Sequence, residues 1–141
     1  MVLDLSIFIN YLLVVELYQI KSVDTHTATI YCGLRDAYST LHHDWDGRYK
    51  IAQKVCQEYC NDVGLCVTIK KVDYIYKDGN EPGIEVGLIN YPRFEETSSR
   101  IDYHANLLAS KLMEKFNQLR VSVVTPEKTY MTMRRNKINK K

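Results

Sequence analysis

The sequence predicts an α+β domain of the ferredoxin-like type, with elements in the order β-α-β-β-α-β. Two stretches carry apolar residues at the three-and-four spacing of amphipathic helices. Between them lie two alternating stretches joined by an Asp78-Gly79 turn, which is the signal of a β-hairpin. Short β-branched runs precede the first helix and follow the second. We therefore expect an antiparallel sheet with both helices on one face, plus an N-terminal appendage.

The first strand and first helix have clear boundaries in the sequence. Residues 28–32 form a β-branched and aromatic run that Gly33 closes, which is typical of a strand. Asp44 or Asp46 can cap the helix that follows. Gly64 can end that helix in the left-handed conformation.

The strand after the first helix is predicted to contain a bulge. Its apolar residues alternate with polar ones as far as Ile69, and the alternation resumes one step out of phase at Val72. One extra residue at Lys70 or Lys71 would explain this shift. After the hairpin turn, residues 84–90 form the return strand.

The second helix and the last strands complete the domain. Pro92 ends the return strand, and residues 95–98 supply a cap and negative charge for a helix that keeps an apolar stripe as far as Leu119. Residues 120–125 form the last core strand. Residues 129–131 are expected to extend the sheet edge.

The chain is expected to have three parts. Residues 1–25 form an appendage, residues 26–131 a single α/β-sandwich domain, and residues 132–141 a basic, disordered tail. The appendage is apolar, but polar residues such as Asn10 and Glu16 interrupt it and make it too short to span a bilayer. No basic residue precedes it, as a signal peptide would require. It either docks on the domain or a partner subunit, or is an upstream extension read from an early start codon.

Charge and cysteine usage argue against nucleic acid and against secretion. The tail holds five of the 19 basic residues, so the first 131 residues carry 14 basic against 17 acidic side chains. A nucleic-acid partner is therefore unlikely on the criterion of a basic body. The four cysteines are expected to stay reduced, which places the protein in the host cytoplasm. Their spacing does not suit a metal.

Sequence alone indicates binding rather than catalysis. We find no nucleophile elbow, phosphate-binding loop or zinc-protease motif, so we expect no enzyme, no catalytic residue, no metal and no cofactor. His42 and His43 lie near Asp44 and Asp46 without a spacing known for a metal, and their role stays open.

The candidate site follows from an expectation about the sheet. We expect the strands at 28–32 and 84–90 to be central, adjacent and parallel, so that their carboxyl ends share one edge, where ligands and anions are favoured. Arginines there can bind phosphate oxygens, aromatic rings can stack on a base, and an amide can fix its orientation. The alternative is that the arginines pair with nearby acids and the aromatic rings only plug a corner. The candidate ligand-binding residues are Arg35, Tyr38, Asn90, Tyr91, Arg93 and Phe94.

The segments 30–35, 64–68 and 81–94 give the chain a resemblance to small bacteriophage proteins, and more narrowly to the first family of phage Thoeris anti-defence proteins. That resemblance implies a protein that sequesters a cyclic ADP-ribose-type nucleotide signal, made by bacterial TIR enzymes, without cleaving it. It also implies a homo-oligomer, either a dimer or a hexamer built from dimers.

Two other functions remain open from the sequence. One is a single-stranded RNA-binding module of the RRM type, in which Tyr31 would stack on a base. The return strand lacks the basic, glycine and aromatic pattern that this module requires. The other is a non-catalytic phage protein-interaction domain that uses the N-terminal segment.

Overall fold

The computed structural model describes residues 4–37 and 44–135. Three helices and five strands lie within these ranges. In chain order they are α1 (Leu5–Leu17), β1 (Thr27–Gly33), α2 (Trp45–Val63), β2 (Val67–Tyr76), β3 (Gly79–Ile89), α3 (Ser98–Lys115), β4 (Arg120–Val124) and β5 (Thr129–Met133).

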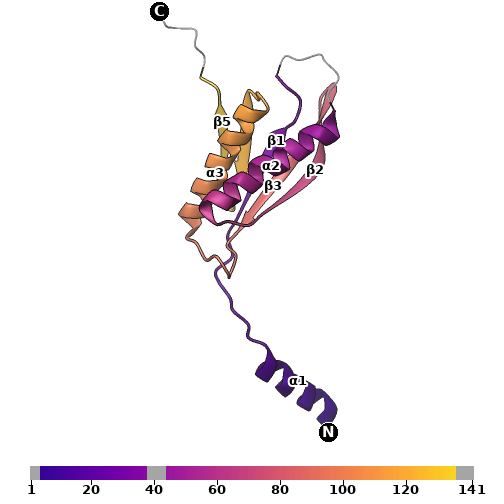
Figure 1. Ribbon diagram of the computed structural model, residues 1–141, viewed down its shortest axis with the longest axis vertical. Coiled ribbons are helices and arrows are strands. Elements are labelled where there is room, and N and C mark those ends of the chain that lie inside the picture. The colour runs from indigo at the N-terminus through magenta and orange to yellow at the C-terminus, as the bar shows by residue number, and fades with distance from the viewer. Residues whose placement is uncertain (1–3, 38–43, 136–141) are drawn as a thin grey trace, which may run out of the picture.

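The strands form one antiparallel sheet in the order β2-β3-β1-β4-β5. Helices α2 and α3 lie side by side on one face of this sheet (Figure 1). The predicted ferredoxin-like fold is confirmed, and β5 extends the sheet edge as expected. The core fills the space between the helices and the sheet, with Ile30 of β1, Val86 of β3 and Leu108 of α3 fully buried.

The prediction that the first and third strands of the domain are parallel is wrong, because β1 and β3 run antiparallel. Thr27 lies opposite Ile89, and Gly33 lies opposite Gly83. In a split βαβ fold the third strand returns from the second through a hairpin, so it must run against the first. The carboxyl end of β1 therefore lies beside the start of β3, and not beside its end.

The predicted bulge in β2 is also absent. Val67 lies opposite Leu88 and Tyr76 lies opposite Gly79, with every residue between them paired in an unbroken register. Because side chains alternate between the faces of a strand, Val67 faces the helices while Tyr74 and Tyr76 face the opposite side. The phase shift in the sequence therefore has another meaning. Most apolar residues of β2 face the helices in its first half and the opposite side of the sheet in its second half.

The helix ends follow their capping residues. The Asp44 side chain accepts a hydrogen bond from the Gly47 N–H, which caps α2, and Gly64 ends that helix with a φ of 75°. Thr97 caps α3 by accepting from the Arg100 N–H. Helix α3 ends at Lys115, earlier than predicted, and Asn117 follows with a left-handed φ of 48°.

Helix α1 lies apart from the sheet domain and is joined to it by an extended segment (Figure 1). Large apolar side chains of this helix, including Leu5, Ile7, Phe8 and Tyr11, are exposed. No helix in the described ranges is long and apolar enough to cross a membrane. The division into appendage, domain and basic tail remains a prediction.

Candidate functional site

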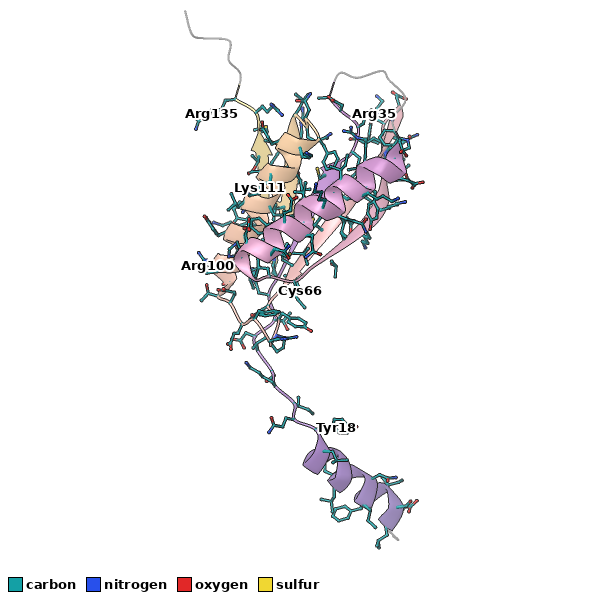
Figure 2. All side chains as sticks on the ribbon, viewed as in Figure 1. Tyr18, Arg35, Cys66, Arg100, Lys111 and Arg135 are labelled. Carbon is teal, nitrogen blue, oxygen red and sulfur yellow. The ribbon has the colours of Figure 1, made fainter. Side chains whose placement is uncertain are left out.

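A concave site of about 600 Å³ lies on the uncovered face of the sheet, at the carboxyl end of β1. This size is within the range of pockets that bind small molecules. Arg35 marks this end of the domain, on the side away from α1 (Figure 2). The lining residues come from β1 and the segment after it, β2, the start of β3, the turn before β4 and β4 itself. They include Tyr31, Gly33, Arg35, Tyr74, Tyr76, Glu81, Gln118 and Arg120.

Two side-chain oxygens meet above Gly33. A β-carbon on Gly33 would lie 2.8 Å from Gln118 Oε1 and 2.8 Å from Glu81 Oε2. Any larger residue in place of Gly33 would push these oxygens aside. The glycine therefore allows a carboxylate and an amide oxygen to converge over the end of β1.

The orientation of Gln118 is fixed by the backbone around it. Its Nε2 donates hydrogen bonds to the carbonyl oxygens of Arg35 and Phe116, which uses both amide hydrogens. Gln118 is buried, with an exposed fraction of 7% for the whole residue. Among the described residues none donates a hydrogen bond to Oε1, so this buried acceptor is aimed at the site.

The turn that carries Arg35 is held from several directions. The Leu34 N–H donates to the Pro82 carbonyl at 3.0 Å, and Arg48 Nε donates to the Leu34 carbonyl. Asn117 Nδ2 donates to Asp36 Oδ1 at 2.7 Å. These contacts hold the backbone on both sides of Arg35 in place, so its side chain projects from a fixed base.

Burial and charge act in opposite directions on Glu81. Burial raises the pKa of this carboxyl above its ordinary value, and the nearby positive charge of Arg35 partly offsets that effect. A second cation near the carboxylate, such as one carried by a ligand, would lower the pKa further. The site therefore favours a positively charged group beside Glu81 at neutral pH.

Tyrosine rings give the site an aromatic wall. Tyr31 projects from the middle of β1, while Tyr74 and Tyr76 project from β2. The Tyr74 ring lies across Gly83, where a β-carbon would come within 2.1 Å of the ring, and its hydroxyl donates to the Ile84 carbonyl at 2.6 Å. Burial raises the pKa of Tyr74, so this hydroxyl stays protonated.

The structure divides the predicted ligand-binding residues between two places. Among the predicted residues that the structure describes, Arg35 alone lines the site beside Gly33. Asn90, Tyr91, Arg93 and Phe94 follow β3, whose end pairs with the start of β1. The prediction that these residues share an edge with Arg35 is wrong because the two strands are antiparallel. Tyr38, His42 and His43 lie outside the described residues.

The β3–α3 corner satisfies its own polar groups. Asn90 Nδ2 donates to the Asp24 carbonyl at 2.8 Å, and Asn90 Oδ1 accepts from the Glu96 N–H at 3.0 Å. The Tyr91 and Phe94 rings stack with centroids 6.0 Å apart, and the Arg93 guanidinium lies 5.4 Å from the centre of the Phe94 ring. These contacts give the side chains of the corner partners within the chain. Tyr91 and Phe94 remain 40% and 41% exposed, and a ligand-binding role for the corner residues stays a prediction.

Comparison with known proteins gives one clear likeness, and it is structural. No family model matches the chain, and no curated protein matches its sequence. A solved phage SAM lyase in complex with S-methyl-5'-thioadenosine superposes with a TM-score of 0.60 at 14% identity, covering 84% of this chain and 96% of that protein. A phage SAM lyase in the apo state superposes with a TM-score of 0.60 at 13% identity, covering 83% and 97%.

This structural likeness bears on two predictions, the absence of enzyme activity and the resemblance to phage anti-defence proteins. The expectation that the chain is not an enzyme is wrong, because its fold is one on which a phage enzyme is built. The resemblance to phage proteins receives support. The narrower resemblance to a Thoeris sponge for cyclic ADP-ribose does not, since the solved neighbour holds S-methyl-5'-thioadenosine.

Proposed function

We propose that the protein binds S-adenosylmethionine, or a closely related adenosine sulfonium, in the site at the end of β1 and cleaves it as a lyase. The observation that carries this proposal is the convergence of Glu81, Gln118, Arg35 and three tyrosines in one pocket. The fold match to a phage SAM lyase over 96% of that protein supports it.

The site contains a group for each part of such a substrate. The rings of Tyr31, Tyr74 and Tyr76 offer flat apolar surface for adenine. The Arg35 guanidinium suits the substrate carboxylate, to which it can donate paired hydrogen bonds. The Glu81 carboxylate favours the positive charges of the substrate, because burial makes its own negative charge costly without a cation nearby.

The reaction needs no water and no cofactor to balance. The bond between the sulfonium sulfur and the γ-carbon breaks, and its electron pair leaves with sulfur as neutral S-methyl-5'-thioadenosine. As this bond breaks, either the carboxylate of the same four-carbon fragment attacks the γ-carbon and closes a lactone, or a base removes a proton from the β-carbon and an alkene forms. The protein would contribute orientation and electrostatic stabilisation to either route.

The test is turnover of S-adenosylmethionine by the purified chain in ¹⁸O-water, followed by mass spectrometry. We expect S-methyl-5'-thioadenosine and a four-carbon product without ¹⁸O on its γ-carbon. Label on the γ-carbon would mean hydrolysis. Absence of turnover, together with recovery of intact cyclic ADP-ribose from the washed and heat-denatured protein, would overturn the proposal in favour of sequestration.

A phage protein with this activity would act by removing a small molecule from the infected cell. That outcome agrees with the predicted anti-defence role, although it reaches it by chemistry instead of sequestration. The RRM-type alternative gains no support from the site. On the uncovered face of β3, Glu85 forms an ion pair with Lys70 at 3.1 Å, where that module would carry aromatic residues.

A further inference from the structure

We propose that the two oxygens above Gly33 form a recognition site for the primary ammonium group of the ligand. This inference rests on the proposed function, because it assigns one part of the same pocket. It makes the protein selective for adenosine ligands that carry an α-amino group. S-methyl-5'-thioadenosine, which lacks that group, would bind without using these oxygens.

The first step concerns what the two oxygens can bind. Gln118 Oε1 and Glu81 Oε2 both accept hydrogen bonds, and both lie 2.8 Å from the point where a β-carbon of Gly33 would sit. Gln118 has no amide hydrogen left to donate, since the Arg35 and Phe116 carbonyls take both. The pair therefore suits a group with several donors and no acceptor.

The second step separates an ammonium group from adenine. An adenine edge presents an amino donor next to a ring-nitrogen acceptor, so it needs a donor beside an acceptor in the protein. An ammonium presents three donors and a full positive charge. The carboxylate of Glu81 strengthens its hydrogen bonds by charge, which a neutral amino group would not exploit.

The third step concerns the neighbouring cation. Arg35 lies close enough to Glu81 for its charge to lower the pKa of that carboxyl. A ligand with an α-amino group and an α-carboxylate would place its ammonium against Glu81 and Gln118 and its carboxylate against Arg35. The arrangement thus matches the amino-acid end of an adenosine sulfonium.

The probes are S-adenosylhomocysteine and its analogue in which hydrogen replaces the α-amino group. Both have a neutral sulfur and keep the carboxylate, so their affinities differ only through the amine. By calorimetry we expect the wild-type chain to bind the first at least about tenfold more tightly, as for a hydrogen bond to a charged group. S-methyl-5'-thioadenosine serves as a third ligand that reports the nucleoside part alone.

Gly33→Ala is the deciding variant, because its methyl group would lie 2.8 Å from both oxygens, and its three nearest neighbours are all side-chain atoms. It should lose the preference for the amine and keep its affinity for S-methyl-5'-thioadenosine. Gly87→Ala is the matched control on the same sheet face, where the new methyl meets Thr68 Oγ1 at 2.6 Å, outside the site. The Gly87→Ala variant should keep the wild-type preference for S-adenosylhomocysteine over the analogue without the amine.

Glu81→Gln provides a second variant that preserves side-chain shape, and it should reduce the preference even if Gly33→Ala fails to fold. Equal affinity of the wild-type chain for the two probes, or an undiminished preference in both variants, would overturn the inference alone. Failure of the wild-type chain to bind any of the three adenosine ligands would overturn the proposed function as well, so the two failures are distinguishable.

Discussion

The two ends of the β1–β3 pair carry similar side chains and use them in opposite ways. Each end has an arginine, an amide and aromatic rings. At the β3–α3 corner, Asn90 uses both its donor and its acceptor on the backbone. At the carboxyl end of β1, Gln118 uses its donors on the backbone and leaves its oxygen facing a pocket.

Residue type alone therefore does not distinguish a ligand site from a structural corner. What distinguishes them is whether the polar atoms already have partners within the chain. The Tyr91 and Phe94 rings stack on each other, whereas Tyr31 and Tyr76 line an open concave surface. Asn90 also lines a pocket, of about 560 Å³, but its side chain already binds backbone groups. The pocket beside Gly33 differs because an oxygen without a donor among the described residues faces it.

The largest expected effect comes from Glu81→Gln. If this carboxylate stabilises charge during turnover, its loss should lower kcat for S-adenosylmethionine by about 10²-fold or more. The matched variant at the other end, Glu96→Gln, should leave turnover unchanged. The two are compared by the rate of S-methyl-5'-thioadenosine formation. Equal losses in both variants would show that the ends do not differ in function.

A smaller effect is expected from the two arginines. Arg35→Met should weaken binding of S-adenosylhomocysteine about tenfold, since a charge-assisted contact to its carboxylate is lost. Arg93→Met should leave this affinity within a factor of two or so, because Arg93 lies over Phe94 at the opposite end of β3. Calorimetry on both variants measures the difference. A stronger effect at Arg93 would reverse the assignment of the two ends.

The sequence was sufficient for most of the fold. Capping at Asp44, the left-handed Gly64, the cap at Thr97 and the hairpin turn are local features, and local chemistry decides them. The structure places that turn at Lys77 and Asp78, one residue earlier than the Asp78-Gly79 signal, with Tyr76 and Gly79 already paired. The site was harder to predict because it depends on which strand ends meet. The β-α-β-β-α-β order already implies that the third strand opposes the first, and applying that rule would have placed the start of the third strand, near Glu81, beside the carboxyl end of the first.

One signal of the site was present in the sequence and was misinterpreted. The phase shift after Ile69 suggested a bulge, but the register through β2 is unbroken. The shift instead moves apolar side chains to the uncovered face, where Tyr74 and Tyr76 line the pocket. The position of Gln118 could not be predicted in this way, because it depends on the left-handed Asn117 that follows α3.

The corner should respond to mutation through stability. Asn90→Ala removes hydrogen bonds to the Asp24 carbonyl and from the Glu96 N–H, so we expect the free energy of unfolding to fall by about 1–2 kcal/mol. Urea unfolding measures this loss. Affinity for adenosine ligands should stay at the wild-type value, and a loss of affinity without a loss of stability would contradict a structural role.

The smallest effect is a pH dependence at the carboxyl end of β1. Burial raises the pKa of Glu81 in the folded chain above the ordinary value of 4.5, so the folded state keeps its proton over a pH range in which the unfolded state has released it. The stability that this protonated form contributes is present below about pH 4.5 and is lost as the pH rises through the raised pKa.

Glu81→Gln mimics the protonated carboxyl at every pH, so the variant and the wild-type chain should melt at the same temperature near pH 4. Toward pH 7 the variant should melt higher, by at most about 4 °C for a chain of this size. The melting temperature of Glu96→Gln, measured at the same two pH values, shows how much the loss of a carboxylate at the corner changes stability. Saturating S-adenosylhomocysteine should reverse the difference at pH 7, because its ammonium stabilises the ionised carboxylate and gives the wild-type chain the larger increase. An equal increase in both chains would mean that no ligand cation lies beside Glu81.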